Sequence, residues 1–370
     1  MVSFLIFALI LSSLVVIHEL GHFWAARKMG VKVEEFGLGI PPKLFGRKYK
    51  GTEYTFNALP IGGFVRLKGE EVHNSDSDSF ESKSPAKRAF IIVAGVLMNL
   101  ILAIVIFQGL LLSKNNVSDY LPLFPGMNPV FGKFEVTPGV FRVDSSSKID
   151  VSKLSNYDYI YSVNGNQISD NEQISKYVNE STSNSVSLVL KNLKDTSIVK
   201  ELEVETLEKD GKKYLGLYLS EVGRINYQND PVVLTGVMHS VNMTLLSFNA
   251  LGTLFSKAFE EKDPTILSAG VGGPVRIYGV VDAVNQESSS VVSDMLNLVA
   301  ILSLSLAVMN ILPIPAVDGG RLVFVLVELI ARRRINPEIE MTVNKFGMFF
   351  LLVLIVLITY SDITLLFFSN

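Results

Sequence analysis

The sequence predicts a polytopic α-helical membrane protein with four transmembrane helices, a re-entrant β-hairpin and an inserted extracytoplasmic domain rich in β-strands. Three observations predict this fold class. The 370 residues are 48% hydrophobic and only 19% charged, whereas an ordinary soluble domain is about 25% charged. Four apolar stretches are long enough to cross about 30 Å of hydrocarbon. Between the second and third stretches the composition becomes that of a soluble domain.

The composition also limits the chemistry and the partners. The chain has no cysteine, which excludes disulfides, zinc ribbons and thiol nucleophiles. Its formal net charge is −3, and nothing in the sequence suggests nucleic acid. We therefore expect the lipid bilayer as a partner, and no nucleic acid.

The first span covers residues 1–26, and basic residues follow it at once: Arg27, Lys28 and Lys32. The end of a span that carries an excess of lysine and arginine faces the cytoplasm. The N-terminus is therefore predicted to lie outside, and the end of this span to lie on the cytoplasmic side.

Near that cytoplasmic end the span contains His18, Glu19 and His22 in an H-E-x-x-H pattern. Residues four apart share one face of a helix, so both imidazoles can bind one Zn²⁺. Glu19 then places a carboxylate beside the metal-bound water as a general base. Ionisable residues inside a membrane usually mark function. The alternative is a short polar interruption of a membrane helix, satisfied by neighbouring helices.

Residues 27–88 form a predicted cytoplasmic-side loop that contains a β-hairpin at residues 53–69. Two short β-favouring runs flank the turn residues 60–63, Pro-Ile-Gly-Gly. Two readings stay open for this hairpin. It is either a cytoplasmic hairpin or a membrane-associated, re-entrant one that approaches the active site. In the second reading an exposed strand edge could bind an extended peptide through main-chain hydrogen bonds.

The second span, residues 89–112, returns outward to a soluble domain at residues 119–229. Short alternating strands, such as residues 185–190 and 215–219, surround one helical stretch at residues 172–178. The order is strand, Asn164-Gly165 turn, helix, strand. A length near 100 residues suits one independent core. We therefore predict a small, β-rich extracytoplasmic domain.

Residues 231–290 are predicted to form an interfacial amphipathic helix followed by a Gly-rich loop, because residues 231–259 are too polar for a confident span. His239 lies in this helix. It offers a further metal ligand, but a position on the polar face of the helix is the favoured interpretation.

The third span and the segment that follows it, residues 291–320, carry a second group of polar residues. Pro313 and Pro315 prevent a regular helix there. Asp318 is a carboxylate of the kind that serves as a third zinc ligand, and Asn310 offers an amide to a substrate peptide. Basic residues follow, so this end also faces the cytoplasm. The alternative is a proline-bent helix end capped by aspartate.

The fourth span, residues 346–368, returns the C-terminus to the outside. Two histidines and one aspartate at similar depth make a three-ligand zinc site with an open position, which is the catalytic kind. The reaction predicted is amide hydrolysis, and a site inside the membrane predicts a membrane-spanning substrate. The alternatives are a catalytically silent membrane scaffold and a metal transporter.

The two motifs together resemble the site-two protease family of intramembrane zinc metalloproteases. They read His18-Glu19-Leu20-Gly21-His22 and Asn310-x-x-Pro313-x-Pro315-x-x-Asp318-Gly319-Gly320. The hairpin sequence and Gly272-Gly273-Pro274 are similar to the bacterial RseP/RasP-type branch. The resemblance implies zinc on His18, His22 and Asp318, with Glu19 as the catalytic base. It implies substrate contacts from the motif after the third span and from the hairpin: Asn310, Pro313, Pro315, Gly62, Gly63 and Phe64.

The resemblance also implies a biological role. In that branch the outer insert is a PDZ domain, and residues 159–168 resemble a PDZ strand-turn core, although residues 140–154 depart from the PDZ pattern. The implied activity is regulated intramembrane proteolysis of single-span membrane proteins already cut by another protease, such as anti-sigma factors, or of remnant signal peptides. The implied location is the bacterial cytoplasmic (inner) membrane, with both termini and the PDZ-like domain outside.

Overall fold

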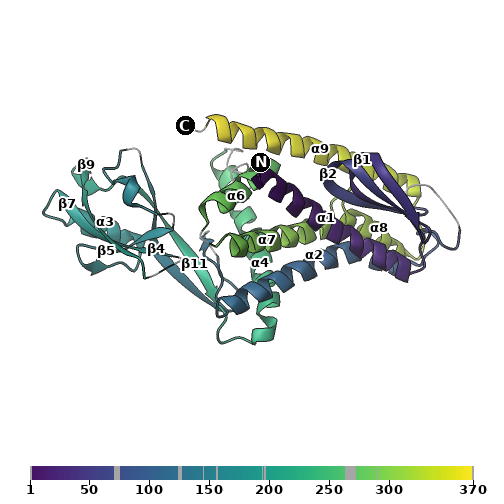
Figure 1. Ribbon diagram of the computed structural model, residues 1–370, viewed down its shortest axis with the longest axis horizontal. Coiled ribbons are helices and arrows are strands. Elements are labelled where there is room, and N and C mark those ends of the chain that lie inside the picture. Colours follow the sequence, from purple (N-terminus) through teal and green to yellow (C-terminus); the bar gives the residue numbers. More distant parts are fainter. Residues whose placement is uncertain are drawn as a thin grey trace. The chain divides into compact units, whose positions relative to one another are not determined.

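The fold is described from a computed structural model of the chain (Figure 1). The structure describes residues 2–70, 76–123, 127–144, 146–155, 157–193, 195, 197–262, 272–288 and 290–368. The chain forms two compact units. The first consists of Met1–Leu110 with Val233–Asn370, and the second of Leu111–Val232.

Four helices of the described part are long and apolar enough to cross a membrane, as the sequence predicts. They are α1 (Val2–Lys28), α2 (Pro85–Ser113), α7 (Val291–Ile311) and α9 (Pro337–Phe368). In the most apolar window of α9 only 6% of the residues are buried by the rest of the chain. An apolar helix surface left uncovered in this way suits contact with lipid tails.

Close contacts between backbones hold α1, α2 and α7 together. A Cβ at Gly21 of α1 would overlap the carbonyl of Ala94 in α2, so only glycine lets the helices approach this closely. One turn further along α2, the Ser303 hydroxyl of α7 donates to the Asn99 carbonyl at 2.8 Å. Small residues and interhelical hydrogen bonds are the usual means of packing helices in membranes.

The hairpin exists, but its predicted bounds and turn are wrong. β1 (Val33–Tyr49) and β2 (Thr52–Leu67) are joined at Lys50 and Gly51, whose φ angles of 48° and 84° suit a two-residue hairpin turn. Residues 60–63 lie inside β2 instead. Both strands bend, so that residues 35–38 pair with 53–56 on one side and with 63–66 on the other. The two runs predicted to pair with each other are therefore separated by β1.

The segment after α7 contains a helix that the sequence pattern does not predict. α7 ends at Ile311 and α8 (Asp318–Ala331) begins six residues after Leu312. The prolines at 313 and 315 explain the break, because they lack the N–H that a continuing helix needs. A Cβ at Gly319 would overlap the carbonyl of Leu312. Glycine therefore allows α8 to start directly against the end of α7.

α4 (Thr235–Glu260) is amphipathic, as predicted, but its polar side is buried within the unit. The amide of Gln108 in α2 donates to the Thr235 hydroxyl at 3.2 Å and accepts from the Gly236 N–H at 2.9 Å. The ring of His239 packs edge-on against Phe107, with centroids 4.7 Å apart. The exposed side is apolar and includes Val237, Val241, Leu245 and Phe248. This is the reverse of an interfacial helix, whose polar face would meet water.

The predicted Gly-rich loop falls mainly on residues 263–271, which lie outside the described residues. After it comes α6 (Pro274–Glu287), which the sequence pattern does not predict. Its Asn285 amide donates to the Ser3 hydroxyl of α1 at 3.3 Å, and its Arg276 N–H donates to Asp362 of α9 at 3.2 Å. α6 therefore ties the first apolar helix to the last.

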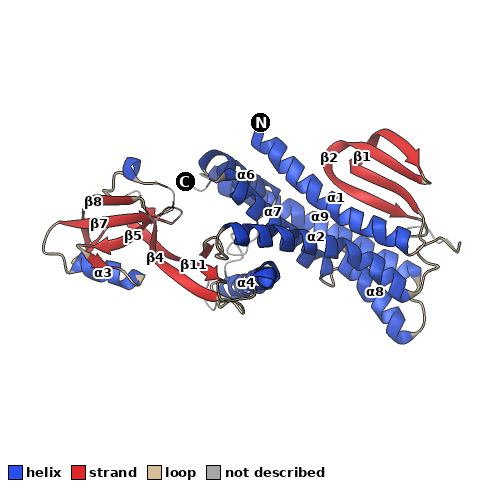
Figure 2. Cartoon of the chain, turned by 60° about the horizontal axis from the view of Figure 1, so that its bottom comes forward, coloured by secondary structure: helices blue, strands red, loops and turns tan. Residues whose placement is uncertain are grey.

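The second unit is built on a sheet with the strand order β3-β11-β4-β5-β7-β8, and β6 pairs with β5. Strands β11, β4, β5, β7 and β8 are labelled in Figure 2. The strand bounds are β3 Leu121–Pro122, β4 Lys133–Val143, β5 Asp158–Val163, β6 Asn166–Gln167, β7 Ser185–Asn192, β8 Val199–Glu205 and β11 Leu217–Asn226; β9 (Leu207–Lys209) pairs separately with β10 (Lys212–Tyr214).

One helix, α3 (Asn171–Asn179), packs on this sheet through Ile174 and Val178, which are four residues apart and both buried. Alternating residues of β7, including Leu188, fill the same core. The predicted order of strand, Asn164-Gly165 turn, helix and strand is confirmed by β5, α3 and β7.

Candidate metal centre

The three predicted metal ligands meet at one point of the first unit. The Nε2 atoms of His18 and His22 lie 3.1 Å apart, and each lies close to one oxygen of Asp318, at 2.9 and 3.2 Å. Within the described part of the chain this is the one group of three or more such side chains that could hold a metal ion. Residues 300 positions apart in sequence thus converge.

The distances in this cluster fit zinc. Ligands about 2.0–2.1 Å from a tetrahedral zinc lie roughly 3.3 Å from one another, and the three atoms here are 2.9 to 3.2 Å apart. Two imidazole nitrogens and one carboxylate oxygen are also the donors that catalytic zinc takes, with a fourth position left for water. His18, His22 and Asp318 therefore fit a catalytic zinc ion.

The second nitrogen of each histidine has a different environment. His22 Nδ1 donates to the carbonyl of Ile91 in α2 at 2.9 Å, which leaves Nε2 as the unprotonated, metal-binding nitrogen. His18 Nδ1 is buried and has no hydrogen-bond partner in the part of the chain that the structure describes. The carbonyl of Ile91 is thus what orients the second ligand.

The backbone of α2 forms a wall of the site at Gly95, a residue that the sequence analysis did not select. A Cβ at this position would overlap the His22 Nε2 atom and would lie 2.9 Å from His18 Cε1. The signal that could have found it is the Ala94-Gly95 pair within an apolar span, since small residues mark close helix contacts. Gly21 and Gly95 together let α2 reach the two histidines.

Asp318 is positioned by the break between α7 and α8. It is in the first turn of α8, and the N–H of Ala316 just before it donates to the Asn344 side chain of α9 at 3.3 Å. One turn later, Arg321 forms an ion pair with Glu70 at the end of the β2 segment. Elements from three parts of the sequence therefore fix the third ligand.

Glu19 faces a cavity of about 250 Å³ beside the cluster. Six polar or ionisable residues line it: His18, Glu19, Asn99, Asn310, Asp318 and Arg321. A Cβ built on Gly63 of β2 would lie 3.9 Å from Glu19 Cγ. Glu19, the predicted general base, thus lies next to the ligand cluster and next to strand β2.

The six predicted substrate residues do not all meet at this cavity. Asn310 lines it, and Gly63 lies next to Glu19. The ring of Phe64 covers Gly37 of β1, and Pro315 packs against Gly347 of α9. The remaining two, Gly62 and Pro313, are also absent from the residues that line the cavity. Asn99 lines the cavity and was missed.

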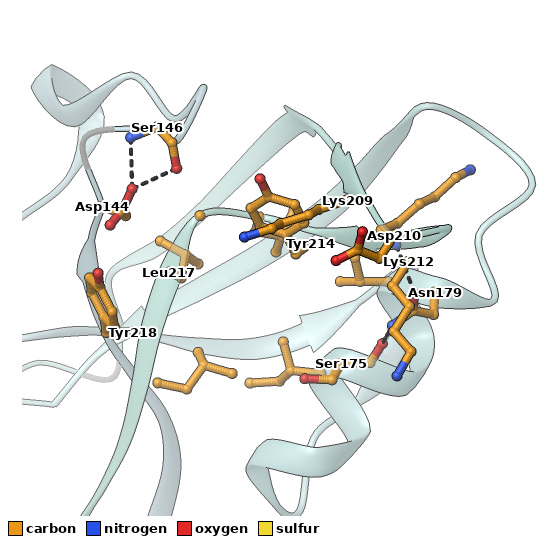
Figure 3. Close-up of a pocket in the computed structure, with 16 residues that line it drawn as sticks. Asp144, Ser146, Ser175, Asn179, Lys209, Asp210, Lys212, Tyr214, Leu217 and Tyr218 are labelled. Carbon is orange, nitrogen blue, oxygen red and sulfur yellow. Dashed lines mark hydrogen bonds between the residues drawn. The ribbon is translucent and has the colours of Figure 1, made fainter.

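A second, larger cavity of about 810 Å³ lies in the other unit (Figure 3). Ser175 and Asn179 of α3 line one side, and Leu217 and Tyr218 of β11 line another. The lysines 209, 212 and 213 contribute positive charge to its lining. The cavity therefore combines an apolar helix–strand groove with basic side chains.

The site combines two histidines, one aspartate and a glutamate beside one cavity, and it lies among helices apolar enough to span a membrane. These features define the class of intramembrane metalloproteases. Comparisons with known proteins agree. The model of peptidase family M50 matches residues 6–354.

The chain is also similar to individual proteases along its whole length. It is 34% identical over 369 residues to a protein named as a candidate zinc metalloprotease in Clostridium perfringens, covering 97% of this chain and 98% of the relative. It is 27% identical over 453 aligned positions to the zinc metalloprotease RasP of Shouchella clausii, covering 99% of each. The chain belongs to peptidase family M50. It is a multi-pass membrane protein and a zinc-dependent metalloprotease.

Proposed function

We propose that the enzyme cleaves single-span membrane proteins within or near their transmembrane segments, after another protease has removed their outer part. Anti-sigma factors and remnant signal peptides are substrates of this kind. The observation that carries the proposal is the position of the ligand cluster and its cavity, which lie among α1, α2, α7 and the start of α8. Because α1, α2 and α7 are long and apolar enough to cross a membrane, we propose that a substrate reaches the site from the bilayer.

In this proposal His18, His22 and Asp318 would hold a zinc ion, which when bound would supply Lewis-acid chemistry for the hydrolysis of an amide. Glu19 accepts the proton of the attacking water and passes it to the leaving amine. The cavity beside Glu19 gives the scissile peptide bond its place. The Ile91 carbonyl keeps His22 in the tautomer that this chemistry needs.

The edge of β2 is proposed to hold the substrate in an extended form. A helix hides its amides in hydrogen bonds, so the substrate must unwind before attack. Residues 63–66 pair with β1 on one side, and no described strand pairs with their other side. Gly63 lies beside Glu19. This edge can add the unwound segment as a further strand.

We infer that this sheet is re-entrant, meaning that it dips into the membrane. Its support is the number of exposed apolar side chains on β1 and β2, which include Ile40, Leu44, Phe45, Phe56 and Leu59. An exposed apolar patch of this kind marks a membrane or protein contact.

We infer that the second unit is a PDZ-like domain on the extracytoplasmic side. The support is the groove between α3 and β11 (Figure 3), because PDZ domains bind extended peptides between a helix and a strand.

The proposed location is the bacterial cytoplasmic (inner) membrane, with both termini outside and the active site toward the cytoplasm. Arg27 and Lys28 end α1, and three arginines at 332–334 follow α8. The ligand-bearing end of α1 and the far end of α8 are thus followed by positive charge, and Arg321 lies one turn after Asp318. Positive charge of this kind faces the cytoplasm.

The test uses the purified full chain in detergent with a single-span peptide that contains helix-breaking residues. Wild type should cleave it, while Glu19→Gln and chelator-treated enzyme should not, and Glu19→Gln should keep about one zinc per chain. Zinc binding without cleavage of several such peptides would favour the scaffold alternative. Zinc flux into liposomes would favour the transporter.

A further inference from the structure

Asn99 is a polar residue in the middle of an apolar helix, and the chemistry assigned above does not use it. It lies in α2, and 0% of its surface is exposed. Neither the Oδ1 nor the Nδ2 atom of its side chain has a hydrogen-bond partner in the described part of the chain. Buried side-chain amides are nearly always paired, so an unpaired one needs an explanation.

The position of Asn99 gives that explanation. It follows Gly95 by four residues and therefore lies on the same face of α2, one turn away. Gly95 touches the imidazoles of His18 and His22. Asn99 lines the cavity that also contains Glu19 and Asn310. Asn99 is therefore one of the residues around the reaction cavity, and its amide is unpaired.

The rotation of α2 at this point is fixed independently of the Asn99 side chain. The backbone carbonyl of Asn99 accepts a hydrogen bond from the buried Ser303 hydroxyl of α7. Nearby, Ala103 of α2 packs against Ala300 and Leu304 of α7. The helix would keep its place without the amide, so the amide does not explain the packing.

We propose that the side chain of Asn99 binds the main chain of the substrate next to the scissile peptide bond. This inference rests on the proposed function. An amide offers both a donor and an acceptor, which is the complement of an extended peptide's C=O and N–H. The hydrogen bonds of Asn99 are then made when the peptide occupies the cavity. Asn99 is thus a substrate-binding residue, and it acts beside Asn310 on the same cavity.

Gln108 of the same helix provides a matched comparison. It carries the same functional group, but its amide nitrogen donates to Thr235 and its oxygen accepts from Gly236. One amide of α2 is thus satisfied by the protein and the other is not. Replacing each by leucine, which has a similar branched shape, should have opposite consequences.

The experiment uses the full-length Glu19→Gln enzyme, loaded with zinc, in detergent. A fluorescent single-span peptide with helix-breaking residues measures binding, and thermal melting and zinc content are recorded for each variant. Adding Asn99→Leu should weaken peptide binding about tenfold, the effect of about 1.4 kcal/mol, with zinc retained and the melting temperature unchanged or raised. Adding Gln108→Leu should lower the melting temperature and leave peptide binding unchanged. Asn99→Ser, which is smaller and removes the amide, should weaken binding as well.

Three results would overturn the inference. Peptide affinity within twofold of the parent in both Asn99 variants would show that the amide does not contact the substrate. A melting temperature lowered as much by Asn99→Leu as by Gln108→Leu would show a structural role, and this comparison holds whether or not the peptide is a substrate. Loss of zinc from both Asn99 variants would place Asn99 in support of the metal. By contrast, failure of wild type to cleave any peptide would count against the proposed function.

Discussion

The two units of the chain encode their structure in different ways. The core of the second unit follows local patterns, such as the alternation along β7 and the i, i+4 pair on α3. The site of the first unit depends on long-range backbone contacts, such as Gly21 against Ala94 and Gly95 against His22. In the second unit the hydrophobic pattern predicts the fold, but it does not say what the domain binds. In the first unit the motif predicts the chemistry, but not the groups that surround it.

The largest effect expected is that of the base itself. Glu19→Gln should lower cleavage of a single-span peptide by about 10²–10⁴-fold, the usual contribution of a general base, while zinc content stays at the wild-type level. The carboxylate is not one of the clustered ligand atoms, so the metal does not depend on it. Parallel measurement of cleavage and zinc checks this. Loss of zinc in the variant would place Glu19 among the ligands instead.

Gly95→Val tests whether the backbone contact is as important as the ligands. A side chain at this position overlaps the imidazole of His22, so we expect loss of zinc and of cleavage in a protein that still folds. Gly109→Val is the control, because a Cβ at that position of the same helix meets nothing within 4 Å. Zinc content and circular dichroism would be measured for both. Normal zinc binding in Gly95→Val would refute the close approach of α2.

Arg88→Met tests a buried ion pair of the first unit. Arg88 in α2 pairs with Glu328 in α8, and both side chains are less than 10% exposed. Removing one partner leaves the other charge buried, which should cost about 3–5 kcal/mol in the free energy of unfolding. Thermal melting checks it. The double variant Arg88→Met with Glu328→Leu should recover much of the loss, and no recovery would mean that packing, not charge, is what matters.

Leu188→Ala tests the local core of the second unit. Leu188 is 1% exposed and lies in the core beneath α3, so its truncation should cost about 2–5 kcal/mol. Zinc content should not change, because the ligands belong to the other unit. Loss of zinc on this substitution would contradict the division of the chain into two units.

The smallest effect expected is at the surface of the second unit. Lys148 and Glu205 lie 2.6 Å apart, but both side chains are more than half exposed. Solvent screens such a pair, so Lys148→Met should change the free energy of unfolding by about 0–1 kcal/mol. Melting alongside Leu188→Ala checks the contrast. A loss as large as that of Leu188→Ala would contradict this ranking.

Much of the fold and of the site was predictable from the sequence, for definite physical reasons. Hydropathy predicts the four apolar helices, because a long apolar helix satisfies all of its backbone hydrogen bonds within itself in lipid. The motifs predict His18, His22 and Asp318, because metal ligands need particular side chains at particular spacings. Alternation predicts β7 and the turn at Asn164-Gly165 predicts the strand–helix order after it.

The remainder depends on contacts that no local pattern records. The hairpin turn was wrong because residues 60–63 carry the stronger glycine and proline signal, while the true turn at Lys50-Gly51 carries one glycine. α6 and α8 were missed because they are only 14 residues each. They also lie next to segments with stronger sequence patterns, namely the Gly-rich stretch before α6 and the two-proline motif before α8. Gly95 and Asn99 were missed because their roles come from the approach of α1 and from a cavity formed by several helices.

The central claim is that His18, His22 and Asp318 hold one zinc ion. The most direct measurement is the zinc content of the purified full chain by elemental analysis, for wild type and for His18→Ala, His22→Ala, Asp318→Ala and His239→Ala. His239 is the matched control, since it is a buried histidine that packs against Phe107 outside the cluster. We predict about one zinc per chain in wild type and His239→Ala, and loss of zinc in the other three. Zinc retained in those three variants, or lost from His239→Ala alone, would contradict the assignment.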